Sequence, residues 1–86
     1  MTRGTLFVVA TPIGNLEDIT LRALDVLRRA SVVAAEDTRT AKKLFDRHGL
    51  STPLVSLHEH SGPARVAELV KRLESGDSVA IVSEAG

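Results

Sequence analysis

The sequence predicts an α/β fold in three layers, with helices on both faces of a parallel β-sheet. Four short apolar runs, rich in β-branched and small residues, are typical of buried strands; they are residues 6–10, 32–35, 54–57 and 79–82. Segments with helical periodicity separate these runs, and each is long enough to cross over between parallel strands. The expected order of elements is β-α-β-α-β-α-β.

Length and composition limit the class of protein. The chain has 86 residues, which suits one domain or part of one, and it has no cysteine, which excludes disulfides and cysteine-based metal sites. Eleven basic and eleven acidic residues cancel, so the composition indicates neither a nucleic-acid nor a membrane-surface partner. No apolar run approaches the ~18 residues of a membrane span and the N-terminus lacks a signal sequence, so we expect a cytoplasmic protein.

The first strand is expected to be buried on both faces, because its apolar run is unbroken. Thr20 is a suitable N-cap for a helix over residues 21–30. Leu21, Leu24 and Leu27 recur on one side of this helix, and we expect that side to pack on the sheet.

Two more helices follow. Asp37 or Thr38 caps one that runs to about His48, and Gly49 suits the left-handed position that ends it. The last helix shows the strongest apolar periodicity in the chain, at i, i+3, i+4 and i+7: Val66, Leu69, Val70 and Leu73.

Each predicted strand ends in a short segment with polar or small residues: 11–15, 36–39, 58–60 and 83–86. The carboxyl ends of parallel strands lie at one edge of the sheet, and open α/β sheets bind their ligands there. We therefore expect these four segments to gather along one edge and to form one side of a binding cleft.

The first segment, Thr11-Pro12-Ile13-Gly14-Asn15, contains neither the G-x-G-x-x-G nor the G-K-[ST] pattern of standard nucleotide sites. Gly14 lets the backbone approach a ligand closely, and Asn15 offers both a donor and an acceptor. A tight turn that needs glycine only for its dihedral angles accounts for the same residues.

In the second segment, Glu36 lies about 20 positions beyond Gly14, the spacing at which an acidic residue holds ribose hydroxyls in nucleotide-binding folds. Arg39 falls in the first turn of a helix, where the helix dipole disfavours a cation. We expect a partner for it, either Glu36, Asp37 or a substrate phosphate. A capped helix with a local ion pair is the alternative that needs no ligand.

His58 and His60 alternate onto one face at the end of the third strand. Such a pair can ligate a metal, but it needs a third ligand that the chain does not clearly supply, so we expect no metal site. A structural role or a substrate contact remains for the pair. The last segment, Ser83-Glu84-Ala85-Gly86, has mostly small residues, which suit either a ligand or a simple turn.

Five blocks occur in a specific order and combination: Thr11-Pro12-Ile13-Gly14-Asn15-Leu16, Asp18-Ile19-Thr20, Ala35-Glu36-Asp37-Thr38-Arg39, His58-Glu59-His60 and Val82-Ser83-Glu84-Ala85-Gly86. Together they resemble the N-terminal part of the ribosomal RNA 2′-O-ribose methyltransferases in the tetrapyrrole methylase family. The chain departs from the family's usual S-D-A-G at Glu84, and Ser61-Gly62 stands where the family commonly has Asn-Glu.

The resemblance implies a partial N-terminal domain of the tetrapyrrole methylase fold. Residues 1–86 would be a truncated α/β domain, with a second domain absent from this chain. It also implies S-adenosylmethionine as the cofactor, bound between two α/β domains, and a homodimer of the full-length protein. The implied reaction is methyl transfer to the ribose 2′-hydroxyl of a cytidine in small-subunit ribosomal RNA, with the ribosomal subunit as partner and no membrane.

The blocks and the resemblance give three groups of candidate residues. The catalytic candidates are Glu36, Asp37 and His58; the cofactor-binding candidates are Pro12, Ile13, Gly14, Ser83, Glu84, Ala85 and Gly86; the substrate-binding candidates are Asn15, Thr38, Arg39 and His60. A carboxylate beside the sulfonium of the methyl donor would stabilise the reactant more than the transition state. The acidic candidates are therefore expected to hold hydroxyls, to orient RNA or to accept the 2′-hydroxyl proton.

Two other functions fit the same sequence. A methylase of a tetrapyrrole or another small molecule agrees with the zero net charge. The first turn of this chain argues against it, because the small-molecule members of the family are expected to have a more glycine-rich turn there. A non-catalytic α/β binding or oligomerisation module is the other alternative. The 86 residues alone are expected to be inactive, because one wall cannot make a cleft.

Overall fold

The computed structural model describes residues 4–11, 16–57 and 62–83, and it has the predicted α/β architecture. The elements, in chain order, are β1 (Leu6–Ala10), the short 3₁₀ helix η1 (Leu16–Asp18), α1 (Leu21–Arg29), β2 (Val32–Ala35), α2 (Thr38–His48), β3 (Leu54–Ser56), α3 (Gly62–Glu74) and β4 (Val79–Ser83). The predicted boundaries agree to within one residue for the strands and for α1 and α2.

The four strands form one parallel sheet in the order β1-β4-β2-β3. The last strand in the chain is therefore central, and it pairs with β1 on one side and with β2 on the other. Ala10 lies opposite Ser83, and Ala35 lies opposite both Val82 and Ser56. This register sets the carboxyl ends of all four strands at one edge of the sheet.

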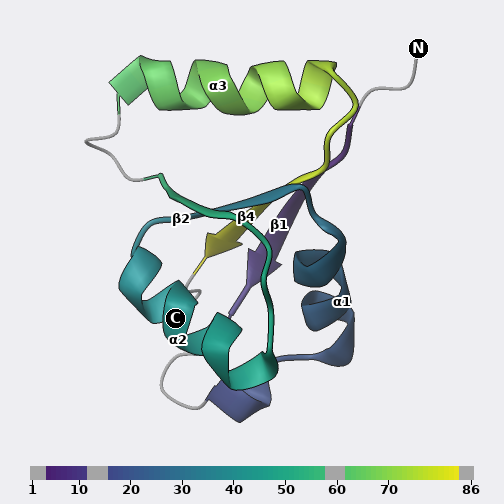
Figure 1. Cartoon of the computed structure of the whole chain (residues 1–86), viewed down its shortest axis with the longest axis vertical. Coiled ribbons are helices and arrows are strands. Elements are labelled where there is room, and N and C mark those ends of the chain that lie inside the picture. Colours follow the sequence, from purple (N-terminus) through teal and green to yellow (C-terminus); the bar gives the residue numbers. More distant parts are fainter. Residues whose placement is uncertain (1–3, 12–15, 58–61, 84–86) are drawn as a thin grey trace.

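Helices cover both faces of the sheet, with α1 and α2 on one face and α3 on the other (Figure 1). The chain moves in one direction from β1 to β2 and β3, and α3 then leads back to β4. Because crossovers between parallel strands are right-handed, this reversal of direction places α3 on the opposite face. Leu27 and Phe45 are buried in the core under α1 and α2, and Leu69 is buried in the core under α3.

Short-range capping fixes the ends of the first two α-helices, as predicted. The hydroxyl of Thr20 accepts a hydrogen bond of 3.0 Å from the backbone nitrogen of Ala23. Asp37, rather than Thr38, is the N-cap of α2. Gly49 ends α2 with a φ of 67°, a left-handed conformation that residues with a Cβ rarely adopt.

The prediction that β1 is buried on both faces is wrong. Side chains on its α1 side are covered, and Val9 is 6% exposed, but Leu6 and Val8 on the other side are 49% and 72% exposed. The reason is the strand order: β1 lies at the edge of the sheet, and α3, the helix described on that face, packs against β4.

The apolar stripes of two helices are also less buried than the periodicity suggested. Leu21, in the first turn of α1, is 85% exposed, so the predicted packing of its side chain on the sheet is wrong. On α3, Val66 and Val70 are about half exposed, while Leu69 is buried. No helix in the described parts of the chain is long and apolar enough to cross a membrane.

Two leucines on α1 test this description of the core. Leu27 is fully buried and Leu21 is 85% exposed, so the same substitution has different costs at the two positions. We expect Leu27→Ala to lower the free energy of unfolding by about 2–5 kcal/mol, because it leaves a cavity in the core. Leu21→Ala is expected to change it by less than about 0.5 kcal/mol. Urea denaturation of both variants measures the difference, and equal losses would contradict the packing.

Candidate functional site

The carboxyl edge of the sheet carries a cavity of about 340 Å³, which we call the inner pocket. Thr11 directly follows β1, Glu36 and Asp37 directly follow β2, and Ser83 ends β4, so three strand ends meet here. The remaining lining residues are Leu16, Ala35, Thr40, Ala41, Leu44 and Val82. The lining combines apolar side chains from β2, β4 and α2 with three hydroxyls and two carboxylates.

Thr11 joins the ends of β1 and β4. Its backbone nitrogen donates to the carbonyl oxygen of Ser83 at 2.9 Å, and its hydroxyl lies 3.4 Å from the same oxygen. Thr11 is 8% exposed, so its polar groups need partners within the protein. The two strand ends are therefore held together next to the pocket.

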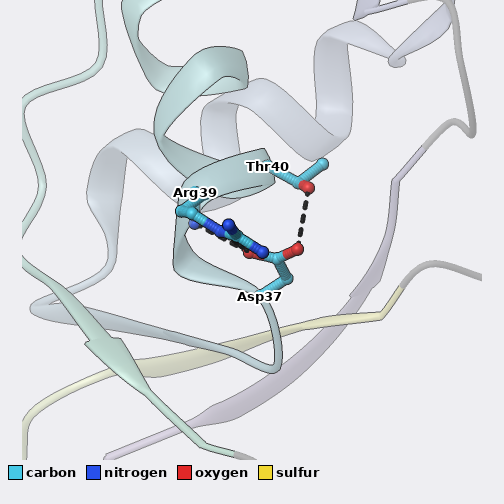
Figure 2. Close-up of polar contacts among 3 residues, drawn as sticks. All are labelled: Asp37, Arg39 and Thr40. Atoms are coloured by element: carbon cyan, nitrogen blue, oxygen red, sulfur yellow. Dashed lines mark hydrogen bonds and ion pairs between the residues drawn. The ribbon is translucent and has the colours of Figure 1, made fainter.

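Asp37 has a structural task in addition to its place in the pocket wall. One carboxylate oxygen, Oδ1, accepts a hydrogen bond of 3.0 Å from the backbone nitrogen of Arg39, and Oδ2 accepts one of 3.3 Å from the Thr40 hydroxyl (Figure 2). The hydrogen bond from the Arg39 backbone is the main cause that lowers the pKa of Asp37 below its usual value of 3.8. Asp37 is thus held in its ionised form.

Arg39, a cation in the first turn of α2, forms an ion pair with the Asp37 carboxylate. Its Nε lies 3.5 Å from Oδ1 of Asp37, which agrees with one of the three predicted partners. The Arg39 side chain is 91% exposed, so this ion pair contributes little to stability. The guanidinium remains accessible to a ligand.

Glu36 differs from its neighbour. It is exposed and lines the inner pocket. Its side chain makes no hydrogen bond or ion pair with the residues that the structure describes. Of the two adjacent carboxylates, Glu36 is therefore the one whose oxygens are open to a ligand.

The far end of α2 supports the pocket through residues that the sequence did not indicate. The Nε2 atom of His48 lies 2.8 Å from the carbonyl oxygen of Leu16, and Arg47 forms an ion pair with Glu17. These contacts hold η1, whose Leu16 lines the pocket, against α2. About 30 residues separate the partners in the sequence, so no local sequence pattern predicts these contacts.

Several candidates lie outside the described residues: Pro12, Ile13, Gly14, Asn15, His58, His60, Glu84, Ala85 and Gly86. The structure brings together Glu36, Asp37 and Ser83 in one pocket, and it places Thr38 and Arg39 on another side of α2. Thr40 and Leu44 were missed, although they stand three and seven positions after the Asp37 cap, on the same face of the helix. Among the described residues, no group of three His, Asp or Glu side chains could hold a metal.

Comparison with known proteins identifies the family. The family model for tetrapyrrole (corrin/porphyrin) methylases matches residues 5–86, and the chain therefore belongs to that family. It is similar to "Ribosomal RNA small subunit methyltransferase I" of Pseudomonas aeruginosa, with 54% identity over the whole chain and 30% of that protein.

Relatives with the same name occur in other bacteria. The Bacillus subtilis protein is 49% identical over 96% of this chain and 28% of its own length, and the Halalkalibacterium halodurans protein is 50% identical over 98% and 29%. The chain thus spans less than a third of the length of these relatives and corresponds to their N-terminal part.

The two neighbouring carboxylates are expected to respond differently to removal. Asp37→Ala should lower the free energy of unfolding at pH 7, because α2 loses its cap. The pKa of Asp37 is depressed in the folded state, so its contribution is present above pH 3.8 and disappears as the pH falls through the lowered value. Glu36→Ala, the matched control, should leave stability unchanged. Urea titrations between pH 7 and pH 2 measure both, and a loss at Glu36 as large as that at Asp37 would contradict the assignment.

Proposed function

We propose that this chain forms one wall of the catalytic cleft of an S-adenosylmethionine-dependent methyltransferase. Its substrate would be the ribose 2′-hydroxyl of a cytidine in small-subunit ribosomal RNA. The observation that carries the proposal is the inner pocket, which an open carboxylate and small apolar side chains line together at the carboxyl edge of a parallel sheet. The family and the names of the relatives give the reaction class and the kind of RNA.

The residues of the inner pocket fit part of a methyl donor of this type. S-adenosylmethionine supplies an activated methyl group on a positively charged sulfur, and it also carries ribose hydroxyls. The cavity of about 340 Å³ lies at the lower end of the range for ligand sites, ~300–1,000 Å³, so it suits one part of such a molecule. The alanine side chains among the lining residues leave room for a flat group, and the hydroxyl of Ser83 offers a hydrogen-bond partner.

Charge distinguishes the roles of the lining residues. A carboxylate next to the sulfur would stabilise the positive charge that is lost in the transition state, and would slow the reaction. We therefore assign neutral groups to the reacting end: the backbone of residues 12–14 and of residues 83–86, with Glu84 through its backbone. We assign the carboxylates to positions where they bind hydroxyl groups instead of the sulfonium.

Glu36 is our candidate for the group that binds and deprotonates the 2′-hydroxyl. Asp37 is already occupied by Arg39 and Thr40, and its lowered pKa makes it a weak proton acceptor. Asp37 therefore has a positioning role, while His58 remains the other candidate base. Holding the hydroxyl in line with the methyl group is expected to supply most of the rate.

The remaining candidates complete the proposal. Asn15, Thr38, Arg39 and His60 would contact the RNA. A second α/β domain would form the opposite wall, and two copies of the full-length protein would form a dimer in the cytoplasm. These parts rest on the family and on the length of the relatives.

A tetrapyrrole or another small molecule is the second candidate substrate, because the matching family is described by corrin and porphyrin methylation. The two substrates can be separated by competition. If RNA is the substrate, a corrin precursor should not reduce methyl transfer to small ribosomal subunits.

The activity test uses the full-length protein, S-adenosylmethionine with a labelled methyl group and small ribosomal subunits. We expect incorporation into RNA, located at a ribose 2′-oxygen. Glu36→Gln keeps the shape of the side chain and removes its charge, and it should lower kcat by a factor of about 10²–10⁴ with unchanged thermal stability.

Two results would count against the proposal. A folded full-length protein that transfers no methyl group to RNA would remove the function. If Glu36→Gln keeps full activity, the methyltransferase function stands, but a residue other than Glu36 is the base.

A further inference from the structure

A second hollow lies on α2, and we call it the outer groove. Its volume is about 440 Å³, and it is lined by Thr38, Arg39, Lys42, Phe45, Asp46, Leu50, Ser51, Thr52 and Leu54. We propose that it binds a backbone phosphate of the RNA strand that enters the inner pocket. The inference rests on the proposed function, and it extends the strand-end segment that contains Arg39 to a groove in which Lys42 is a second cation.

The two hollows lie on different flanks of one helix. The inner pocket uses positions 37, 40, 41 and 44, which share one face of α2, whereas the outer groove uses positions 38, 39, 42, 45 and 46, which share another. Asp37 lines the inner pocket and Arg39 lines the outer groove, and their ion pair, at 3.5 Å, links the two hollows at the start of the helix. A ligand that fills both hollows would cross the N-terminal end of α2.

Charge on α2 favours an anion. Its cationic residues are Arg39, Lys42, Lys43 and Arg47, against the single acidic residue Asp46, although the whole chain has a net charge of zero. Arg39 is 91% exposed. The Lys42 side chain is exposed and makes no hydrogen bond or ion pair with the described part of the chain. Two accessible cations therefore line the same groove.

The groove also has the hydrogen-bonding groups that suit a phosphate. The guanidinium of Arg39 can bind two phosphate oxygens in parallel, and Lys42 adds a mobile point charge. The hydroxyl of Ser51 is exposed at the rim. The hydroxyl of Thr52 is already used, since it donates to the carbonyl oxygen of Leu27 at 2.8 Å. Phe45, which is buried, gives the groove an apolar floor.

The separation of the two hollows limits which phosphate is bound. An α-helix with its side chains is about 10 Å across. A nucleic-acid strand covers this distance in about three nucleotides at a rise of ~3.4 Å each. The bound phosphate would therefore lie within about three nucleotides of the methylated one. Such a contact fixes the position of the strand without reading its sequence.

Lys42 and Lys43 provide a matched test, because they are adjacent, exposed and on one helix, but only Lys42 lines the outer groove. In the full-length protein, Lys42→Ala should raise KM for small ribosomal subunits about three- to tenfold, with kcat and KM for S-adenosylmethionine unchanged. It should also reduce the slope of log binding constant against log salt by about 0.7–0.9. Lys43→Ala should have neither effect.

Asp46 supplies a test of opposite sign, since a carboxylate at the groove repels a phosphate. Asp46→Asn should lower KM for ribosomal subunits and leave kcat unchanged. Circular-dichroism melting of each variant checks that folding is intact.

The possible outcomes separate this inference from the proposed function. If Lys42→Ala retains the wild-type KM and salt slope, or if Lys42→Ala and Lys43→Ala weaken RNA binding equally, the outer groove is not a phosphate site and the methyltransferase function stands. If the wild-type protein methylates no RNA, the proposed function itself fails.

Discussion

The parallel register of β1, β4 and β2 is the constraint on which the rest of the structure depends. The chain places its last strand between its first two, and each strand then ends at the same edge. Thr11 binds the end of β4 through Ser83, and Asp37 starts α2 immediately beyond β2. A pocket results from segments that are up to 72 positions apart in the sequence.

Helix α2 connects this pocket with the surface. Its first turn is fixed by Asp37, whose carboxylate binds the backbone and Thr40 on the pocket side and Arg39 on the outer side. The neighbouring Glu36 has no such structural task among the described residues, and is therefore open to a ligand. Two adjacent carboxylates thus have different roles because only one of them caps a helix. The cationic residues farther along α2 extend the same surface away from the pocket.

Local patterns in the sequence predicted the elements and three of the helix caps. A hydroxyl at Thr20, a carboxylate at Asp37 and a glycine at Gly49 act within a few residues, so their effect is visible without a fold. Strand order is different, because pairing joins distant segments; the exposure of Val8 at the sheet edge was therefore predicted wrongly. The contact of His48 with Leu16 has no local signal either. The same holds for the close approach of Gly4 to Asp77, where a Cβ on residue 4 would lie 1.7 Å from the Asp77 carbonyl oxygen. Within the site, Glu36 and Asp37 were recognised as a pair, but only the hydrogen bonds assign them different tasks.

The central claim is that the carboxyl edge of this sheet is one wall of a methyl-donor cleft. A crystal structure of the full-length protein with S-adenosylmethionine tests it most directly. We predict that the bound donor contacts the residues around the inner pocket, with the Glu36 carboxylate away from the sulfur and free to meet the RNA hydroxyl. A donor bound at the opposite edge of the sheet, or a carboxylate of this chain against the sulfonium, would contradict it.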